Sequence, residues 1–363
     1  MTRHPFIRSF FAMILLVLVV QAAVIAVYAV KPQLFYFRAW EYFFRWSNTT
    51  QADDSVWDGT ELSDLGRRYF FYYQEKRDTH ASTDADGFRS VPPGQGAPRI
   101  YVHGRSNVFG SGVSDSQTLP WQIAELSGVA TFNGAHSNPL ATLSRESLSE
   151  VKLVVDVFHE RHLANIKVTR RVYQLKQGKL LPYTPIAKNR LSLFQAFYRP
   201  ILRPSYWLPD LVQRWHQRLM LDLKEYRLWG HRPFLLIDYR ADNTPISEIA
   251  DILDQRRAVI EAQGYSYIAA IIPSRQTIYA RKKVPQDTLQ RGVRVAQELI
   301  SRGFPLVQLH PDFKARGGPE LYYVYDTHWN PRGTELAAEL IVAEIGRRYP
   351  ELLETQPVQQ ASQ

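Results

Sequence analysis

The sequence contains no cysteine, which excludes disulfide bonds, thiolate metal sites and cysteine nucleophiles. It also lacks a basic helix with interleaved stacking aromatics and any nucleic-acid motif, so we expect no nucleic-acid partner. Its 44 Lys and Arg residues exceed its 35 Asp and Glu residues, giving a net charge of +9, but the basic residues are scattered. The charge therefore favours an acidic partner such as anionic lipid or an anionic polysaccharide.

Charge is also absent from residues 9–30, where Gln21 is the one moderately polar interior residue. At about 1.5 Å per residue, a helix of this length covers roughly 33 Å, enough to cross the hydrocarbon core of a membrane. We interpret the run as a transmembrane helix; a cleaved signal peptide is the alternative, because residues 27–29 form an acceptable cleavage site. Since only a short tail precedes the run, we expect a single-pass protein of the inner (plasma) membrane with its domain on the periplasmic or extracytoplasmic side.

The rest of the chain is long enough for a large domain, since 363 residues with 45% hydrophobic content can form a sizeable core. The aromatic stretch 34–46 suits either the headgroup layer of a membrane or a helix packed on the domain. Residues 47–66 are polar and are interpreted as a linker. We expect four regions: cytoplasmic tail and transmembrane helix at 1–33, aromatic juxtamembrane segment and linker at 34–83, the main domain at 84–350, and a flexible tail at 351–363.

Within the main domain, apolar runs alternate with amphipathic ones. Such alternation predicts a parallel β-sheet covered on both faces by helices, with the functional site at the carboxyl ends of the strands. The expected strands are 99–103, 129–133, 153–158, 267–272 and 306–310, and the expected helices are 118–126, 246–263, 286–302 and 331–348.

The alternation breaks at about 164–232, which we interpret as an insertion that caps the site or contacts a partner. Within it, residues 171–185 predict a hairpin, and a helical stretch is expected from there to about Trp229. The apolar run 234–239 is another strand, either of the main sheet or of the insertion.

A candidate general base stands near the end of the chain. Asp326 precedes His328 by two residues, and His328 lies between a turn and the helix expected at Pro331. A carboxylate in this position orients an imidazole for proton abstraction. Taken alone, the pair would also suit a metal site, a helix cap or a surface loop; no metal-ligand cluster at a recognised spacing accompanies it.

The candidate nucleophile is Ser106, two residues after Gly104 and directly behind an expected strand. A serine hydroxyl is a weak nucleophile and needs a base to remove its proton. A Gly-x-Ser after a strand can also be an ordinary turn, but together with His328 it predicts a serine-dependent acyl-transfer site.

Several stretches resemble one superfamily. Residues 84–89 and 104–113 look like the first block of the SGNH (GDSL-type) hydrolases, and 132–135 are similar to the second block. Residues 151–163, 272–279 and 326–330 resemble the branch of this superfamily that contains alginate O-acetyltransferases. The resemblance covers about residues 84–348 and implies an SGNH-like (flavodoxin-like) α/β three-layer sandwich with a central parallel sheet, here preceded by the transmembrane helix.

The resemblance also implies residue roles. Ser106 would be the nucleophile, His328 the base and Asp326 its orienting carboxylate. The backbone N–H groups of Ser106 and Ala135 would hold the oxyanion, with Asn133 as an additional side-chain donor.

Two departures from the superfamily pattern concern the same site. Arg105 replaces a small or acidic residue before the serine and would either crowd the pocket or bind an anionic group. The asparagine of the third block is missing, and His159, Glu160 and Arg161 stand in its place. We expect Glu160 and Arg161 to form an ion pair beside the site rather than to act on substrate.

Three functions agree with these patterns. The favoured one is a membrane-tethered O-acyltransferase acting on a cell-surface polysaccharide. The others are an acetyl or carboxyl esterase with the same triad and a non-catalytic glycan-binding subunit. The expected partners are a carbohydrate acceptor or acylated glycan and a multi-spanning membrane acyl-transfer protein; we expect no metal and no cofactor.

Overall fold

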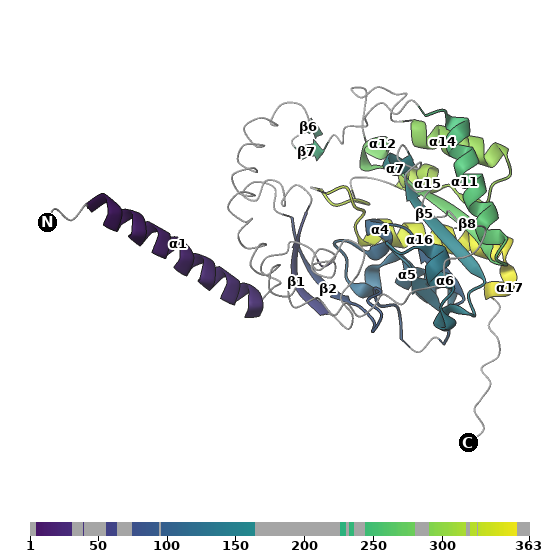
Figure 1. Cartoon of the computed structure of the whole chain (residues 1–363). Helices are drawn as coiled ribbons and strands as arrows, with labels where there is room; N and C mark the ends of the chain where they lie inside the picture. Colours follow the sequence, from purple (N-terminus) through teal and green to yellow (C-terminus); the bar gives the residue numbers. More distant parts are fainter. Residues whose placement is uncertain are drawn as a thin grey trace, which may run out of the picture.

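The computed structural model describes residues 5–30, 39, 56–63, 75–93, 96–163, 226–229, 232–235, 244–279, 290–316, 320–324 and 326–353. A five-stranded parallel sheet runs through the centre of the domain in the order β4-β3-β5-β8-β9 (Figure 1). The strands are β3 (Ile100–His103), β4 (Thr131–Asn133), β5 (Leu153–His159), β8 (Ser266–Ile272) and β9 (Leu306–Val307). Strand β4 lies on one side of β3, and all later strands lie on the other. The order in which strands are added to the sheet therefore reverses between β3 and β5, which makes this a topological switch point. In open α/β sheets, ligands bind outside the carboxyl ends of the strands at such a switch point.

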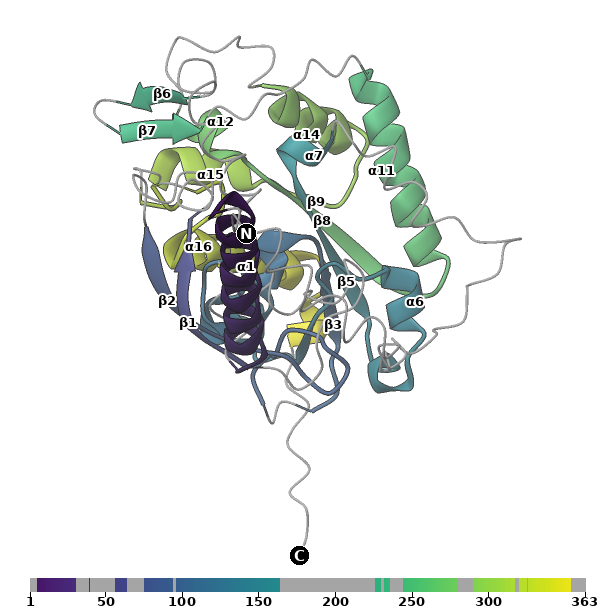
Figure 2. The ribbon, with the colours of Figure 1, turned by 60° about the vertical axis from the view of Figure 1, so that its left-hand side comes forward.

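Helices cover both faces of this sheet (Figure 2). Successive side chains of a strand point to opposite faces, so each strand contributes to two cores. Val102 and Val155 belong to one core, and Tyr101 and Val154 belong to the other. The first core includes side chains of α5 (Leu119–Ser127), α15 (Leu309–Arg316) and α16 (Pro331–Arg348); the second includes those of α6 (Pro139–Leu143), α11 (Ile246–Glu261) and α14 (Arg291–Ser301). The predicted three-layer α/β sandwich with a central parallel sheet is confirmed.

Most of the predicted elements are confirmed with small shifts at their ends. One prediction is wrong at its end: the strand expected at 306–310 stops at Val307, and α15 begins at Leu309. Leu309 and Phe313 are both fully buried, and their spacing of four residues places them on one helix face. Among the described residues, the other short helices are α4 (Ser106–Phe109), α7 (Glu160–Leu163), α12 (Arg275–Tyr279), α17 (Pro350–Leu353), η2 (Asp115–Gln117) and η3 (Glu146–Leu148).

An antiparallel hairpin precedes the main sheet in sequence. It consists of β1 (Val56–Leu62) and β2 (Lys76–Ser82). The interpretation of 47–66 as a linker is therefore wrong for residues 56–62. The apolar side chains Trp57 and Ala81 join the first core, and the buried carboxylate of Glu61 accepts a hydrogen bond from the Ala39 N–H at 2.6 Å. The polar composition did not indicate a strand, because a polar side chain such as that of Glu61 can be buried when it has a hydrogen-bond partner.

Two further predictions need correction. Residues 226–229 are not helical but form β6 (Tyr226–Trp229), which pairs with β7 (Arg232–Leu235) in a separate two-stranded sheet. The described part of the run 234–239 therefore lies outside the main sheet. The tail expected from residue 351 includes the end of α17, where Leu352 is buried. The hairpin expected at 171–185, and the aromatic stretch 34–46 apart from Ala39, lie outside the described residues.

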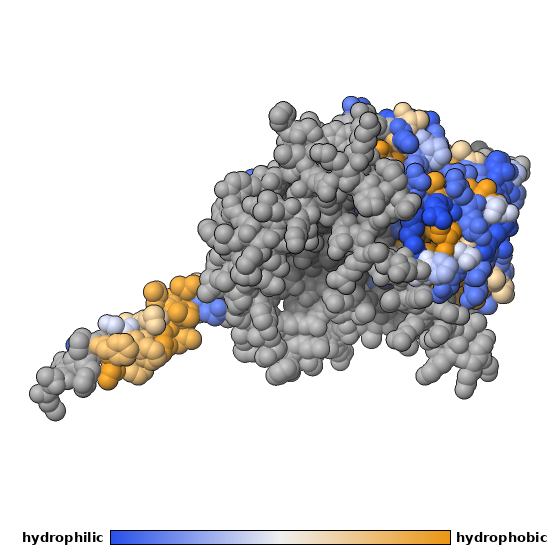
Figure 3. All heavy atoms as spheres, turned by 90° about the horizontal axis from the view of Figure 1, so that it is seen from above, coloured by the Kyte–Doolittle hydropathy of each residue, from blue (hydrophilic) through white to orange (hydrophobic). Residues whose placement is uncertain are grey.

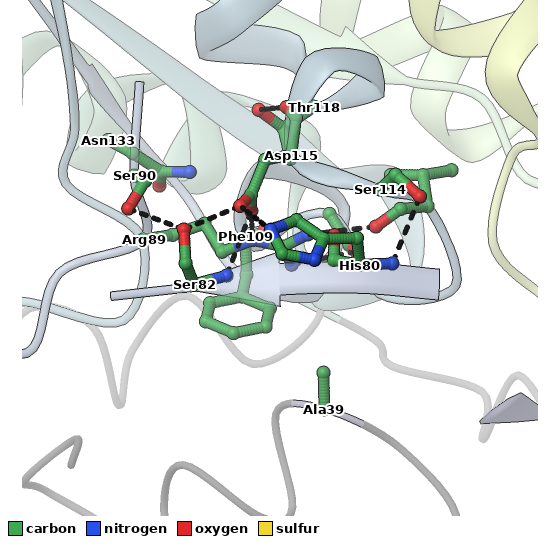
Figure 4. Close-up of polar contacts among 12 residues, drawn as sticks. Ala39, His80, Ser82, Arg89, Ser90, Phe109, Ser114, Asp115, Thr118 and Asn133 are labelled. Carbon is green, nitrogen blue, oxygen red and sulfur yellow. Dashed lines mark hydrogen bonds and ion pairs between the residues drawn. The ribbon is translucent and has the colours of Figure 1, made fainter. Parts of the chain in front are cut away.

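A network around a buried ion pair connects strand β2 with the segment that follows α4 (Figure 4). Arg89 donates to the Asp115 carboxylate and, at 2.9 Å, to the carbonyl oxygen of Val113. Asp115 also accepts a hydrogen bond from the Ser82 hydroxyl at 2.6 Å. Strand β2 and the turn behind Ser106 are thus held by one network of charge-assisted hydrogen bonds.

A second buried network lies at the carboxyl end of β3 and the middle of β5, where His103 is paired with Asp156. The Asp156 carboxylate is fully buried; Arg256 Nη2 donates to its Oδ1 at 3.0 Å, and His103 Nδ1 lies 2.8 Å from Oδ1. The Tyr267 hydroxyl donates to Oδ2 at 3.1 Å. Burial alone would raise the pKa of Asp156, but Arg256 and His103 lower it to about 2.

We expect Asp156→Asn to destabilise the protein by about 3–5 kcal/mol, because Arg256 would remain buried without a counter-charge. A depressed carboxyl pKa contributes stability that is present above about pH 4 and lost as the pH falls towards 2, so the variant should also lack this dependence. Denaturant unfolding of the full chain in detergent, followed by tryptophan fluorescence, measures both effects. The control is Asp58→Asn, since the Asp58–His80 pair is exposed and should contribute less than about 1 kcal/mol. Equal stability of Asp156→Asn and wild type would contradict the prediction.

The N-terminal helix α1 (Pro5–Val30) stands apart from the sheet and its helices in Figure 1, and its surface is hydrophobic in Figure 3. Residues 6–23 have a mean hydropathy of 2.2, and none of them is buried. By length and composition this helix is able to cross a membrane. A signal sequence has the same properties, so both alternatives raised by the sequence agree with α1.

Candidate active site

Ser106 lies at the carboxyl end of β3, beside the switch point of the sheet. Strand β3 ends at His103, Gly104 makes the turn, and Ser106 is the first residue of α4. A Cβ atom on Gly104 would lie 2.4 Å from Val108 Cγ2 and 3.0 Å from the Val157 carbonyl oxygen. Glycine is therefore required for the close turn that places Ser106 at this edge.

His328 is held by the structure around the start of α16. Asn330 caps this helix, because its side-chain oxygen accepts a hydrogen bond from the Gly333 N–H at 3.1 Å. Trp329 is buried and forms a β-bridge with Tyr322, whose hydroxyl donates to the Pro273 carbonyl oxygen at 2.6 Å. The loop that carries His328 is thus fixed on both sides of the histidine.

The structure brings the three predicted catalytic residues together. His328 Nε2 lies 2.8 Å from Ser106 Oγ, and His328 Nδ1 lies 2.7 Å from Asp326 Oδ1. Asp326 and His328 are buried, whereas Ser106 is half-buried. The hydrogen bond to the carboxylate assigns the proton of a neutral imidazole to Nδ1, which leaves Nε2 free to accept the serine proton. The arrangement is that of a serine nucleophile with its oriented base.

Asp326 has a further partner that the sequence reasoning missed. Arg77 of β2 donates from Nη2 to Asp326 Oδ2, while Oδ1 also accepts from the Thr327 N–H at 2.7 Å. No apolar periodicity marks β2, because its alternately buried side chains include polar ones such as Arg77 and Thr79. The contact joins residues 249 positions apart, and no local motif announces it.

Two of the predicted oxyanion residues, Asn133 and Ala135, are hydrogen-bonded to each other. Asn133 Nδ2 donates to the Val108 carbonyl oxygen at 3.2 Å, and Asn133 Oδ1 accepts from the Ala135 N–H at 3.2 Å. Asn133 therefore links α4 to the loop behind β4. Within the described part of the chain, no residue accepts a hydrogen bond from the Ser106 N–H. The oxyanion roles of Ser106, Ala135 and Asn133 stay predictions, and that of Ala135 requires its N–H to exchange Asn133 for substrate.

The loop behind β4 is closely fitted to β3. A Cβ atom on Gly134 would lie 2.2 Å from the Tyr101 ring, so only glycine fits. The next residue but one, His136, has a φ of 60°, a left-handed conformation that is uncommon outside glycine. Its N–H donates to the Gly104 carbonyl oxygen at 2.8 Å, which ties this loop to the turn before Ser106.

Two basic side chains flank the triad. Arg105 is exposed, and no described residue forms an ion pair with it; burial of part of its side chain and the charge of Arg256 lower its pKa. The pKa of His136 is lowered to about 4, first by burial and then by the charges of Arg105, His103 and His328. At neutral pH, His136 is thus uncharged and Arg105 is the cation next to the nucleophile. Its exposure favours the anion-binding alternative over a crowded pocket.

Glu160 does not face the triad but joins neighbouring elements. Its Oε1 accepts hydrogen bonds from the Ser274 N–H at 2.7 Å and from the Thr277 hydroxyl, so it connects α7 with the start of α12. The backbone of Arg161 belongs to α7, but its side chain lies outside the described residues. The expected ion pair between the two stays a prediction. Among the described residues, no group of three His, Asp or Glu side chains is arranged to hold a metal ion.

Comparison with known proteins assigns the C-terminal part of this fold. Residues 235–363 match the family model of the SGNH hydrolase-like domain of the acetyltransferase AlgX. Over these residues the chain is similar to an SGNH hydrolase-like domain. The resemblance found in the sequence is confirmed, and it supports an activity of the acetyltransferase or esterase type. The matched region of this domain contains Asp326 and His328 but not Ser106.

More remote similarities involve solved structures. The chain is 14% identical to a protein assigned to the SGNH hydrolases from Slackia heliotrinireducens, over 69% of this chain and 100% of that one, with a TM-score of 0.34. It is 8% identical to a protein assigned to the lipolytic G-D-S-L family from Desulfitobacterium hafniense, over 68% and 99% of the two chains, with a TM-score of 0.36. Such similarity is too low to argue function. No curated protein matches the sequence.

Proposed function

We propose that this protein is a membrane-anchored SGNH-type O-acyltransferase that modifies a cell-envelope polysaccharide or exopolysaccharide. The single observation that carries the proposal is the hydrogen-bonded series from Ser106 Oγ to His328 at 2.8 Å and from His328 to Asp326 at 2.7 Å. The apolar helix α1 supports anchoring in the inner membrane with the domain outside the cytoplasm, and the match to an acetyltransferase family supports acyl transfer.

In the first half-reaction, Ser106 Oγ attacks the carbonyl carbon of an acyl donor while His328 Nε2 takes the hydroxyl proton. Asp326 stabilises the imidazolium that forms, and backbone N–H groups near Ser106 hold the oxyanion. The tetrahedral intermediate then breaks its bond to the donor alcohol, which leaves with the proton from His328. The acyl group is now esterified to Ser106.

In the second half-reaction, His328 takes the proton of a sugar hydroxyl as that oxygen attacks the acyl carbon. Breakage of the bond to Ser106 Oγ releases the acylated sugar, and His328 returns the proton to the serine. The donor in this scheme is an acylated group presented by a multi-spanning membrane protein. An esterase would use the same three residues with water as the acceptor.

Transfer and hydrolysis can be separated with the full-length protein in detergent. We expect an activated acetyl ester to leave an acetyl group on the peptide containing Ser106, and added oligosaccharides to accept it faster than water does. Mass spectrometry of the protein and of the glycans measures both products. Ser116→Ala is the matched control, because Ser116 is exposed on η2 and outside the triad.

Two outcomes would contradict the proposal in different ways. Acetyl release at a rate that no tested oligosaccharide changes, with no acetylated sugar, would assign the esterase reaction. Absence of acetyl–Ser106 and of turnover would assign the non-catalytic, glycan-binding function.

A further inference from the structure

We propose that Arg77, from the hairpin before the domain, is a positioning residue that holds the Asp326 carboxylate in the orientation His328 requires. This inference rests on the proposed function. It extends the active site to β2, a strand in the region that the sequence assigned to a juxtamembrane segment and linker.

The first observation is how the Asp326 carboxylate is shared. Oδ1 accepts from His328 Nδ1 at 2.7 Å, and Oδ2 accepts from Arg77 Nη2 in a buried ion pair. A carboxylate held at both oxygens cannot rotate about its bond to Cβ without breaking a charge-assisted hydrogen bond. Arg77 therefore fixes the plane in which Oδ1 faces the imidazole.

The second observation is that the guanidinium of Arg77 is itself held in place. Its carbon lies 3.5 Å from the centre of the Tyr323 ring, and the Tyr323 hydroxyl donates to the Gly112 carbonyl oxygen at 2.6 Å. Glu75 Oε2 lies 3.9 Å from Arg77 Nη2, while Glu75 Oε1 accepts from the Val324 N–H at 3.2 Å. Stacking on an aromatic ring with a planar hydrogen-bonding group is a property of arginine that lysine does not reproduce.

The third observation is the space left for this side chain. Gly112 has a φ of 85°, and a Cβ atom there would lie 2.0 Å from Arg77 Nη1. The absence of a side chain at Gly112 therefore leaves the space that the Arg77 guanidinium occupies. Arg77 is 8% exposed, so its contact with Asp326 is little screened by solvent.

The charges around His328 predict how pH dependence responds to loss of Arg77. Asp326 and Arg77 lie on one side, with Glu75 beside Arg77 and Arg105 next to Ser106. His136 is uncharged at neutral pH, and Tyr323 is a neutral phenol because burial raises its pKa to about 12. Removal of the Arg77 cation leaves the Asp326 charge less compensated, which favours the protonated imidazole. Activity should then begin to fall at a higher pH on the acidic side.

The test uses the full-length protein and kcat/KM for an activated acetyl ester as a function of pH. We expect Arg77→Gln to lower kcat about 10- to 100-fold with little change in KM, the effect of a misplaced catalytic group, and to move the acidic limb upward. Arg77→Lys should lose less activity and keep the limb near that of wild type. Arg145→Gln is the matched control, because Arg145 is also buried and paired with a carboxylate, that of Asp86, but does not contact the triad.

A double-mutant cycle with Asp326→Asn distinguishes positioning from general stabilisation. If Arg77 acts through Asp326, adding Arg77→Gln to Asp326→Asn costs no further activity. A loss of the same factor in both backgrounds, or wild-type rate and pH profile for Arg77→Gln, overturns the inference. Circular dichroism checks folding; if Arg77→Gln does not fold, Arg77→Lys takes its place in the cycle, and a loss that persists with Asp326→Asn again overturns it.

Failure of the proposed function would look different. An active Ser106→Ala protein would overturn the serine mechanism itself. A Ser106→Ala protein without activity, together with an Arg77→Gln protein of wild-type rate and pH profile, would overturn the role of Arg77 alone.

Discussion

Ser106→Ala is expected to lower kcat for an activated acetyl ester by about 10⁴- to 10⁶-fold, because it removes the hydroxyl that lies 2.8 Å from His328 Nε2. His328→Ala should cost about as much, since a serine without its base is a weak nucleophile. The double variant should be little slower than either single variant, because nucleophile and base act as one unit. Steady-state kinetics of the purified full-length proteins measure all three.

Two matched substitutions control for effects on folding. Ser116→Ala removes an exposed serine hydroxyl, and His310→Ala removes a half-buried imidazole on α15. Both should retain nearly the wild-type rate. Activity of Ser106→Ala equal to that of Ser116→Ala would exclude a serine acyl-enzyme.

The central sheet was accessible from sequence because its strands are buried on both faces. Such strands read as continuous apolar runs, as in β5 and β8, and the helix at 331–348 was found to the residue because Pro331 and Arg348 mark its ends. Ser106 could be placed at the carboxyl edge of the sheet because it follows β3, whereas His328 was paired with it only through the predicted roles of nucleophile and base. Periodicity and strand direction thus carried most of the prediction.

The hairpin could not be predicted from the sequence, because its strands bury polar side chains. Strands β1 and β2 bury Glu61, Arg77 and Thr79, and a buried polar residue carries no signal in a hydrophobic pattern. Its partners, such as Asp326 for Arg77, lie far away in the chain. The hydrogen bond from the Asn133 side chain to the Val108 carbonyl oxygen likewise has no signal in the sequence.

These findings change how the candidate site is bounded. Ser106 follows β3, and its helix α4 accepts a hydrogen bond from Asn133. The turn after α4 is connected to β2 through Arg89 and Asp115. The base is connected to the same strand through Asp326 and Arg77. The segment after the nucleophile and the carboxylate of the base are thus both bonded to β2. Any protein used to study the activity must therefore include the hairpin.

Asp326→Asn should have the second large effect, a loss of about 10⁴-fold in kcat, although it changes few atoms. Arg77 donates from a charged group and therefore draws the amide oxygen of the new asparagine towards itself. The amide NH₂ then faces His328 Nδ1 and can only donate to it. The imidazole proton must move to Nε2, which can no longer accept the serine proton.

The backbone predicts how this defect can be relieved. The N–H groups of Thr327 and His328 donate to Asp326 Oδ1 at 2.7 Å and 3.3 Å, so they favour an amide oxygen on the His328 side. In Asp326→Asn the stronger Arg77 contact opposes them, and in the variant that also carries Arg77→Gln this opposition is weakened. The double variant should therefore be at least as active as Asp326→Asn alone, although Arg77→Gln slows the wild type. Kinetics of the four proteins at one pH give the comparison, and a double variant slower than Asp326→Asn would show that Arg77 does not act through this carboxylate.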